Sequence, residues 1–177
     1  MAGWRELLTS VTEEKHASLV GYGVLLTGDR SKAEDLVQDA LVKVFARPRK
    51  LPSVAAADQY VRRTMATLYV DHSRRNSLWR RLRPSLIDTE NARSPESAVA
   101  AGTDVRAALA LLSPRERACV VLRHFDDMTI TDIAHRLGIS EGAIKRYLAD
   151  GMSKLGAELA DSEERILITA TQRSRRN

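Results

Sequence analysis

Cysteine, aromatic residues and long apolar runs are scarce in this sequence of 177 residues. Its one cysteine, Cys119, has no partner for an intramolecular disulfide or a thiolate metal cluster. No stretch approaches the ~20 apolar residues of a membrane-spanning helix. The N-terminal residues also lack the apolar segment of a signal peptide. We therefore expect a cytoplasmic protein with no membrane insertion.

Catalytic motifs are absent as well. There is no phosphate-binding loop or dinucleotide motif, and the four histidines show no metal-ligand spacing such as HExxH. Cys119 falls on or beside an apolar stripe, where a buried structural thiol is expected rather than a nucleophile. The Asp126-Asp127 pair is expected to form an exposed turn. The sequence predicts a protein that is not an enzyme and needs no cofactor or metal.

What the sequence does contain is helical periodicity, with 44% hydrophobic residues and few glycines or prolines. It predicts an all-α fold of two small helical domains, 1–83 and 104–160, joined by a flexible linker over 84–103. Residues 161–177 are expected to be a frayed tail, and a contact with an inhibitor or DNA is the alternative. In the first domain, helices are predicted over 19–26, from a Ser31–Glu34 capping box to Phe45, and from an Asp58 cap to about Arg75.

The strongest local pattern is Thr129–Leu148, which has the spacing of a helix-turn-helix. Ala134 is small where two helices cross, Gly138 ends the first helix, and Ile144 fills the space between them. In this motif the second helix enters the DNA major groove. The candidate DNA contacts on that helix are Ser140, Glu141, Gly142, Lys145, Arg146 and Ala149. A plain helical hairpin is the alternative.

Two charged segments in the first domain have opposite signs. Residues 62–83 contain seven arginines and one acid, with Tyr69 and Trp79 between them, which suits phosphates and unpaired bases. Asp35, Gln38 and Asp39 share one helix face, and an acidic face suggests a protein partner rather than DNA. The alternative for both segments is a solvated helix face.

Three motifs together resemble extracytoplasmic-function (group 4, sigma-70 family) sigma factors. Residues 33–40, Ala-Glu-Asp-Leu-Val-Gln-Asp-Ala, resemble their polymerase-binding segment. Residues 60–67, with Asp71 and Arg74-Arg75, resemble the promoter-melting helix of region 2. Residues 112–155 resemble their region 4, which carries the helix-turn-helix. The resemblance covers residues 5–83 and 104–160, in the order of the family.

The resemblance implies a role for each surface. Asp35, Gln38 and Asp39 would bind the clamp helices of the largest subunit of core RNA polymerase. The 47–58 loop and the following helix would capture a flipped base of the promoter −10 element. The second helix of the helix-turn-helix would read the −35 element near the polymerase flap. The −10 contacts would be Lys50, Arg62, Arg63, Thr67, Arg74 and Arg75. The family further implies an anti-sigma factor that clamps both domains.

Three residues depart from the family pattern. Thr67 stands where asparagine is common, and Tyr147 and Asp150 stand where arginine is common. Asp150 would repel phosphate if it faced DNA, so an unusual promoter set is expected. Two other functions remain open: a stand-alone helix-turn-helix regulator, and a sigma-like decoy that binds polymerase without melting DNA.

Overall fold

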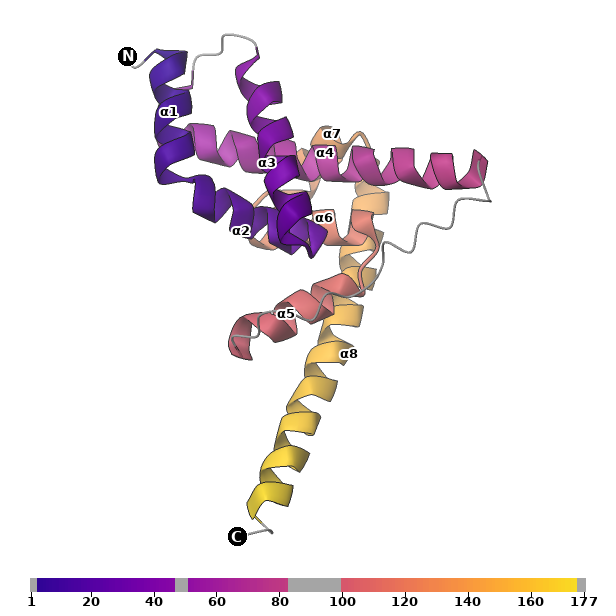
Figure 1. Ribbon diagram of the computed structural model, residues 1–177. Helices are drawn as coiled ribbons and strands as arrows, with labels where there is room; N and C mark the ends of the chain where they lie inside the picture. The colour runs from indigo at the N-terminus through magenta and orange to yellow at the C-terminus, as the bar shows by residue number, and fades with distance from the viewer. Residues whose placement is uncertain (1–2, 47–50, 83–99, 175–177) are drawn as a thin grey trace.

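Every regular element in the described part of the chain is a helix (Figure 1). The computed structural model describes the backbone of residues 3–46, 51–82 and 100–174. The all-α prediction is confirmed. The helices are α1 (Trp4–Glu14), α2 (His16–Thr27), α3 (Arg30–Phe45), α4 (Val54–Leu82), α5 (Ala100–Ala110), α6 (Pro114–His124), α7 (Ile130–Leu137) and α8 (Glu141–Ser174).

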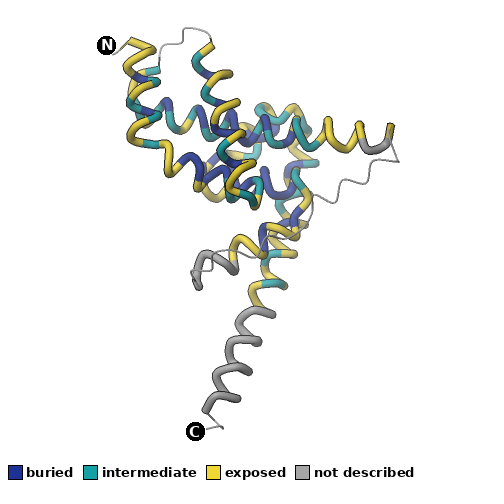
Figure 2. Tube along the Cα trace, viewed as in Figure 1, coloured by how far each residue is buried: buried dark blue, intermediate teal, exposed yellow. Residues whose placement is uncertain are grey.

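Helices α1 to α4 form the N-terminal bundle, in which α3 packs against both α2 and α4. The apolar stripe predicted on α3 faces inward, as the tube coloured by burial shows (Figure 2). Gly23 lets α2 approach α3 closely, because a Cβ there would lie 2.9 Å from the Cβ of Ala33. Helix α1 was not predicted, although its buried Leu7 and Val11 lie four residues apart.

Two predicted helix starts in this bundle are wrong. Asp29, not Ser31, caps α3, because its carboxylate accepts a hydrogen bond from the Lys32 amide at 2.8 Å. Helix α4 begins at Val54, where the Ser53 hydroxyl accepts from the Ala56 amide. Asp58 therefore lies inside the helix. It forms an ion pair with Arg62 one turn later, at 3.0 Å.

The C-terminal half is built from α5 to α8, and several predicted signals hold there. Ser113 and Glu116 form the expected capping box at the start of α6. The boundaries differ from the prediction at two places. Helix α5 begins at Ala100, inside the predicted linker, and α8 continues to Ser174, so the 161–174 segment is helical rather than frayed. The linker residues 84–99 lie outside the described residues.

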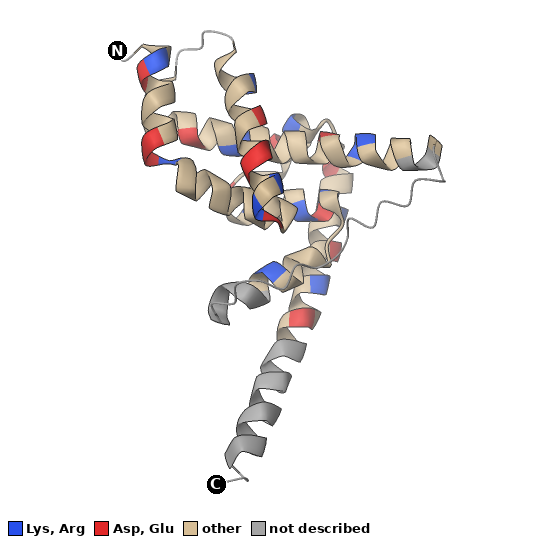
Figure 3. Cartoon of the chain, viewed as in Figure 1, with Lys and Arg blue, Asp and Glu red and all other residues tan. Residues whose placement is uncertain are grey.

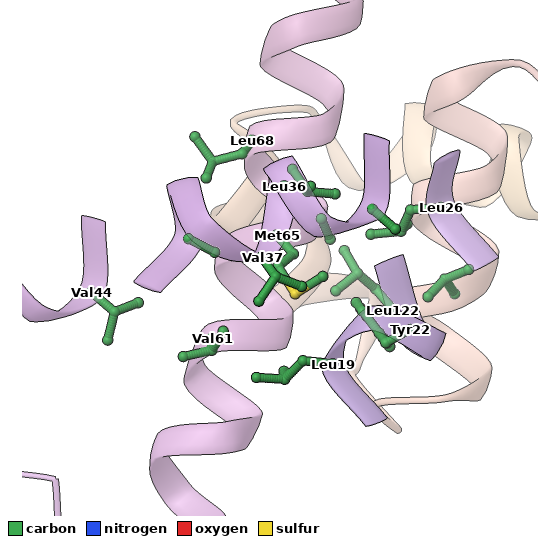
Figure 4. Packing of buried hydrophobic residues seen from close by; sticks show 14 of the residues in the cluster. Leu19, Tyr22, Leu26, Leu36, Val37, Val44, Val61, Met65, Leu68 and Leu122 are labelled. Carbon is green, nitrogen blue, oxygen red and sulfur yellow. The ribbon is translucent and has the colours of Figure 1, made fainter. Parts of the chain in front are cut away.

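The two halves pack against each other through one hydrophobic core. Leu122, Cys119 and Val121 of α6 belong to the same buried cluster as Leu19 and Leu26 of α2. Figure 4 shows Leu122 among the side chains of the N-terminal bundle. Helix α6 also contacts α4. The tertiary structure thus fixes a domain arrangement that the sequence pattern left open.

Candidate promoter and polymerase interface

The helix-turn-helix geometry of α7 and α8 is confirmed. Ile144 is fully buried and Ala134 is 9% exposed. Both residues therefore lie between the two helices, as the pattern predicted. Gly138 ends α7 in the left-handed conformation with φ of 64°, and the next amide donates to the carbonyl of Ala134. A turn of this kind favours glycine because a Cβ is costly there.

The face of α8 that was predicted to read DNA is open to solvent. Glu141 is anchored by the Thr131 hydroxyl, which donates to its carboxylate at 2.8 Å and so ties the start of α8 to α7. The predicted DNA contacts are all exposed: Ser140, Glu141, Gly142, Lys145, Arg146 and Ala149.

The two departures on α8 lie in different surroundings. Tyr147 is half-buried, and its hydroxyl accepts a hydrogen bond from Arg115 at 3.1 Å. The guanidinium of Arg146 lies 5.5 Å from the centre of the Tyr147 ring. Asp150 is exposed. Tyr147 therefore joins α8 to α6 through its hydrogen bond with Arg115, whereas Asp150 places a negative charge on the solvent-facing surface.

The predicted −10 residues on α4 fall into two groups. Arg74 and Arg75 are exposed toward the free end of the helix, which projects beyond the body of the molecule. Arg62 is only 25% exposed, pairs with Asp58, and lies 5.3 Å from the centre of the Tyr22 ring. The buried Nε of Arg63 has no hydrogen-bond partner. Lys50 lies outside the described residues.

Thr67 and the two aromatic residues of the basic segment also differ in how exposed their side chains are to solvent. The hydroxyl of half-buried Thr67 donates to the Arg63 carbonyl at 3.1 Å, within the helix. Tyr69 packs against the core, and burial raises the pKa of its hydroxyl, which the nearby Arg117 charge partly offsets. Trp79 is 61% exposed. Of the two aromatics, Trp79 alone presents a free ring to a base.

The predicted polymerase-binding residues lie together on the exposed face of α3. Asp35, Gln38 and Asp39 are all exposed, and Figure 3 shows the acidic groups along this helix. Asp39 lies 3.8 Å from the His72 ring of α4. We call Asp35, Gln38 and Asp39 the acidic ridge.

An apolar groove lies beside the acidic ridge, between α1 and the end of α3. Its volume is about 530 Å³, and Gln38 lines it together with Trp4 and Val42. Val42 is 70% exposed. The ridge therefore borders an apolar surface, a combination suited to a protein partner.

One prediction is corrected in the turn after α6. Asp126 is 8% exposed, not part of an open turn, and accepts a hydrogen bond from the Tyr22 hydroxyl at 2.7 Å. Burial raises the pKa of this carboxyl, whereas the Tyr22 hydroxyl and the charges of Arg62 and Arg63 favour its ionised form. Asp127 is exposed as predicted, in the left-handed conformation with φ of 50°.

Two further contacts between the halves were not predicted. Arg117 is 6% exposed and donates to the carbonyl of Leu26 in α2 at 2.8 Å and to that of Leu109 at 2.6 Å. Arg136 of α7 lies 5.3 Å from the centre of the Tyr60 ring in α4. No local periodicity marks the contacts of Arg117 with Leu26 and of Arg136 with Tyr60, since these partners are distant in sequence.

The described part of the chain offers few side chains for metal binding or nucleophilic chemistry. Among the residues whose side chains are described, 3–46, 51–79, 82 and 105–160, no cluster of three or more His, Cys, Asp or Glu is arranged to hold a metal ion. Cys119 is fully buried as predicted, and burial raises the pKa of its thiol to about 12. None of the described helices has the length and apolar character needed to cross a membrane.

Comparison with known families matches both halves of the chain. The family model of sigma-70 region 2 matches residues 13–78, which include the acidic ridge and most of α4. The family model of sigma-70 region 4 matches residues 103–155, which include the helix-turn-helix.

Individual relatives and one solved structure agree with these matches. The chain is 33% identical over 141 residues to the RNA polymerase sigma-E factor of Streptomyces coelicolor, covering 76% of this chain and 75% of that protein. It is 30% identical over 149 residues to the ECF RNA polymerase sigma factor SigL of Mycobacterium tuberculosis, covering 80% and 82%.

The fold is similar to that of the Bartonella quintana sigma factor RpoE, solved in complex with the anti-sigma factor NepR. The TM-score is 0.61 at 22% identity, over 88% of this chain and 95% of that one. Given the two family matches and relatives that align over most of their length, the chain belongs to the extracytoplasmic-function sigma factors, which bind core RNA polymerase and direct transcription from specific promoters.

Proposed function

We propose that this sigma factor uses three separate surfaces for its three contacts with polymerase and promoter DNA. The acidic ridge on α3 binds core polymerase, the basic face of α4 holds the −10 strand, and the exposed face of α8 reads the −35 element. The corresponding domains are 1–83 for region 2, 84–103 for the linker, 104–160 for region 4 and 161–177 for the tail. The observation that carries the proposal is that the residues of the ridge and of the reading face are all exposed to solvent.

The acidic ridge is the proposed site for the clamp helices of the largest polymerase subunit. Asp35 and Asp39 supply negative charge, and Gln38 supplies both a donor and an acceptor at the edge of the apolar groove. Complementary charge speeds association, whereas buried apolar contact supplies much of the binding free energy. The groove beside the ridge adds that apolar contact.

The −35 and −10 roles rest on different kinds of contact. At the start of α8, Ser140 and Glu141 lie where a recognition helix reaches base edges, and Lys145 and Arg146 are positioned to bind phosphates. Along α4, Arg74 and Arg75 are available to the melted strand, and Lys50, Arg62, Arg63 and Thr67 complete the proposed −10 set. The region 4 contact with the polymerase flap belongs to the same proposal.

An anti-sigma factor is the proposed regulator. The structural neighbour is a sigma factor in complex with such a protein. The acidic ridge and the reading face of α8 are the surfaces that an inhibitor would have to cover. We place the protein in the cytoplasm because its polymerase partner works there, and propose that it acts as a specificity subunit without an enzymatic activity of its own.

Run-off transcription tests the proposal. Purified protein and core RNA polymerase are incubated with a pooled genomic promoter library, and the transcript starts are sequenced. Defined starts that share −35 and −10 elements are the expected result. Core binding without starts would identify the decoy, and duplex binding by the protein alone, without core binding, would identify a conventional regulator.

A matched pair of variants tests the acidic ridge. The double change Asp35→Lys and Asp39→Lys is expected to abolish core-dependent transcription, because it reverses the charge presented to the polymerase. The control is Glu13→Lys with Glu14→Lys, which makes the same charge change on exposed residues of α1. Equal transcription from the two double variants would refute the role of the ridge.

A further inference from the structure

The first residue of the reading helix carries a carboxylate that another helix holds in place. Glu141 begins α8, and the hydroxyl of Thr131 in α7 donates to its Oε1 atom at 2.8 Å. Both residues are exposed. Within the described part of the chain, no hydrogen bond or ion pair occupies the second oxygen of this carboxylate, Oε2. The side chain is therefore fixed at one oxygen and available at the other.

The neighbouring residues leave this carboxylate accessible to DNA. The Oγ of Ser140 accepts from the Ala143 amide at 3.3 Å, so it is engaged in capping the helix. Gly142 has no side chain, and a Cβ built there would meet no atom within 4 Å. The backbone of α8 can therefore approach a duplex closely at this point. Lys145 lies one turn after Glu141, and its charge offsets the repulsion between the carboxylate and the DNA phosphates.

The base that suits such a group follows from its hydrogen-bonding chemistry. An ionised carboxylate offers acceptors only, so it needs a donor on the base. In the major groove, guanine presents two acceptors, and thymine presents an acceptor and a methyl group. Adenine presents its amino donor beside the N7 acceptor. Cytosine presents the N4 amino donor without an acceptor on its own edge, and glutamate accepts from that amino group.

We propose that Glu141 selects a cytosine in the −35 element and that Thr131 is a positioning residue for this contact. The inference rests on the proposed −35 role of α8. Thr131 holds one carboxylate oxygen, and the other accepts a hydrogen bond from the N4 amino group of the base. Because the side chain is oriented before DNA binds, less conformational entropy is lost on binding. Helix α7 thus contributes to sequence reading without a base contact of its own.

Glu141→Gln and Asp150→Asn form a matched pair for the test. Each removes one negative charge from an exposed position of α8, so each changes the nonspecific attraction to DNA by a similar amount. Asp150 lies about two and a half turns further along, on the opposite side of the helix from Glu141. Glutamine offers a donor and an acceptor, the pair that recognises N6 and N7 of adenine. Glu141→Gln should therefore lose the cytosine preference and gain one for adenine, whereas Asp150→Asn should keep cytosine.

Selection from a randomised −35 element measures the preference. A promoter found by run-off transcription is resynthesised as a pool of duplexes in which each −35 base pair is randomised. The duplexes retained by the full-length protein with core polymerase are sequenced. A single wrong base pair in a specific site lowers affinity by about 5-fold or more. We expect the unaltered protein and Asp150→Asn to enrich cytosine by about that factor at one position, and Glu141→Gln to lose this enrichment.

Two variants of Thr131 test its positioning role. Thr131→Val keeps the shape of the side chain but removes the hydroxyl, whereas Thr131→Ser keeps the hydroxyl. Ordering one flexible side chain weakens binding by about 2- to 10-fold. Thr131→Val should therefore lower the cytosine enrichment by about that factor, and Thr131→Ser should retain it. A residue that only held α7 against α8 would affect binding to every sequence alike and leave the enrichment unchanged.

The outcomes separate this inference from the proposed function. Equal cytosine enrichment by Glu141→Gln and Asp150→Asn, both with native circular dichroism, would overturn the role of Glu141, as would a −35 motif without a G·C base pair. If Glu141→Gln fails to fold, Thr131→Val decides the question, and unchanged enrichment in that variant would also overturn the inference. An unaltered holoenzyme with no base preference anywhere in the randomised element would refute the proposed −35 role of α8 itself.

Discussion

The close approach of α2 and α3 makes a sharp prediction about two glycines of one helix. A Cβ built on Gly23 would lie 2.9 Å from the Ala33 Cβ, 3.1 Å from its Cα and 3.2 Å from its carbonyl oxygen. Two of these three atoms belong to the backbone of α3, so a side-chain rotation cannot relieve the contact. Gly21 lies two residues earlier, and a Cβ built there would meet no neighbouring atom within 4 Å.

The expected change in the free energy of unfolding has two parts, one from helix propensity and one from packing. Replacing an interior helical glycine by alanine stabilises a helix by about 0.5–1 kcal/mol. Overpacking a well-filled interface costs about 1–3 kcal/mol. Gly21→Ala should therefore gain about 0.5–1 kcal/mol, whereas Gly23→Ala combines that gain with the overpacking cost. The difference between the two variants isolates the overpacking cost, which is about 1–3 kcal/mol.

Thermal and urea unfolding followed by circular dichroism measure this difference. For a chain of this size, 1 kcal/mol corresponds to roughly 2–4 °C in Tm. Gly23→Ala should melt below Gly21→Ala by several degrees, and it should also weaken core binding, because it displaces the helix that carries the acidic ridge. If Gly23→Ala is as stable as Gly21→Ala, the close approach of α2 and α3 does not exist as described.

Three further predictions concern the C-terminal half. Cys119, with its pKa raised to about 12, should resist iodoacetamide at pH 8 in the folded protein and react only after unfolding. Gly138→Ala, at a φ of 64°, should cost about 1–2 kcal/mol and lower −35 duplex binding by disturbing the turn, as urea titration and anisotropy would show. Burial by itself would raise the pKa of the Glu116 carboxyl. Hydrogen bonds from Lys154 and Ser113 outweigh this effect, and the net result is a lowered pKa. The resulting stabilisation is complete above about pH 4.5 and is lost as the pH falls through the lowered value, so Glu116→Gln should flatten the acid limb of stability against pH.

Much of the fold was predictable from local patterns. The apolar stripe of α3, the capping box at Ser113 and the glycine turn at Gly138 each involve residues within a few positions of one another. Such signals act through the helix period and through backbone hydrogen bonds, which are local in sequence. The starts of α3 and α4 were predicted wrongly because several polar residues compete to cap a helix, and neighbouring packing decides among them.

The sequence predicted which residues belong to the candidate site, but it did not predict how exposed each of them is. The exposed acidic ridge and the exposed reading face of α8 follow from helix periodicity, because a polar face opposite an apolar stripe points to solvent. Arg62 and Arg63 have the same polar character, yet Arg62 is only 25% exposed and pairs with Asp58 of its own helix, and the Nε of Arg63 is buried. Arg62 also donates a hydrogen bond to the Ser18 hydroxyl of α2, 44 residues away, a contact that no periodicity can reveal.

By itself, the sequence determined most of the helices, the helix-turn-helix, the charge of each surface and the family to which the chain belongs. These properties depend on side-chain type at short spacing, so they can be read directly from the residues. Only the tertiary structure decided that α6 joins the core of the N-terminal bundle and that Asp126 is buried against Tyr22. That contact joins residues 104 positions apart, and it forms because the apolar faces of α2 and α6 exclude water together.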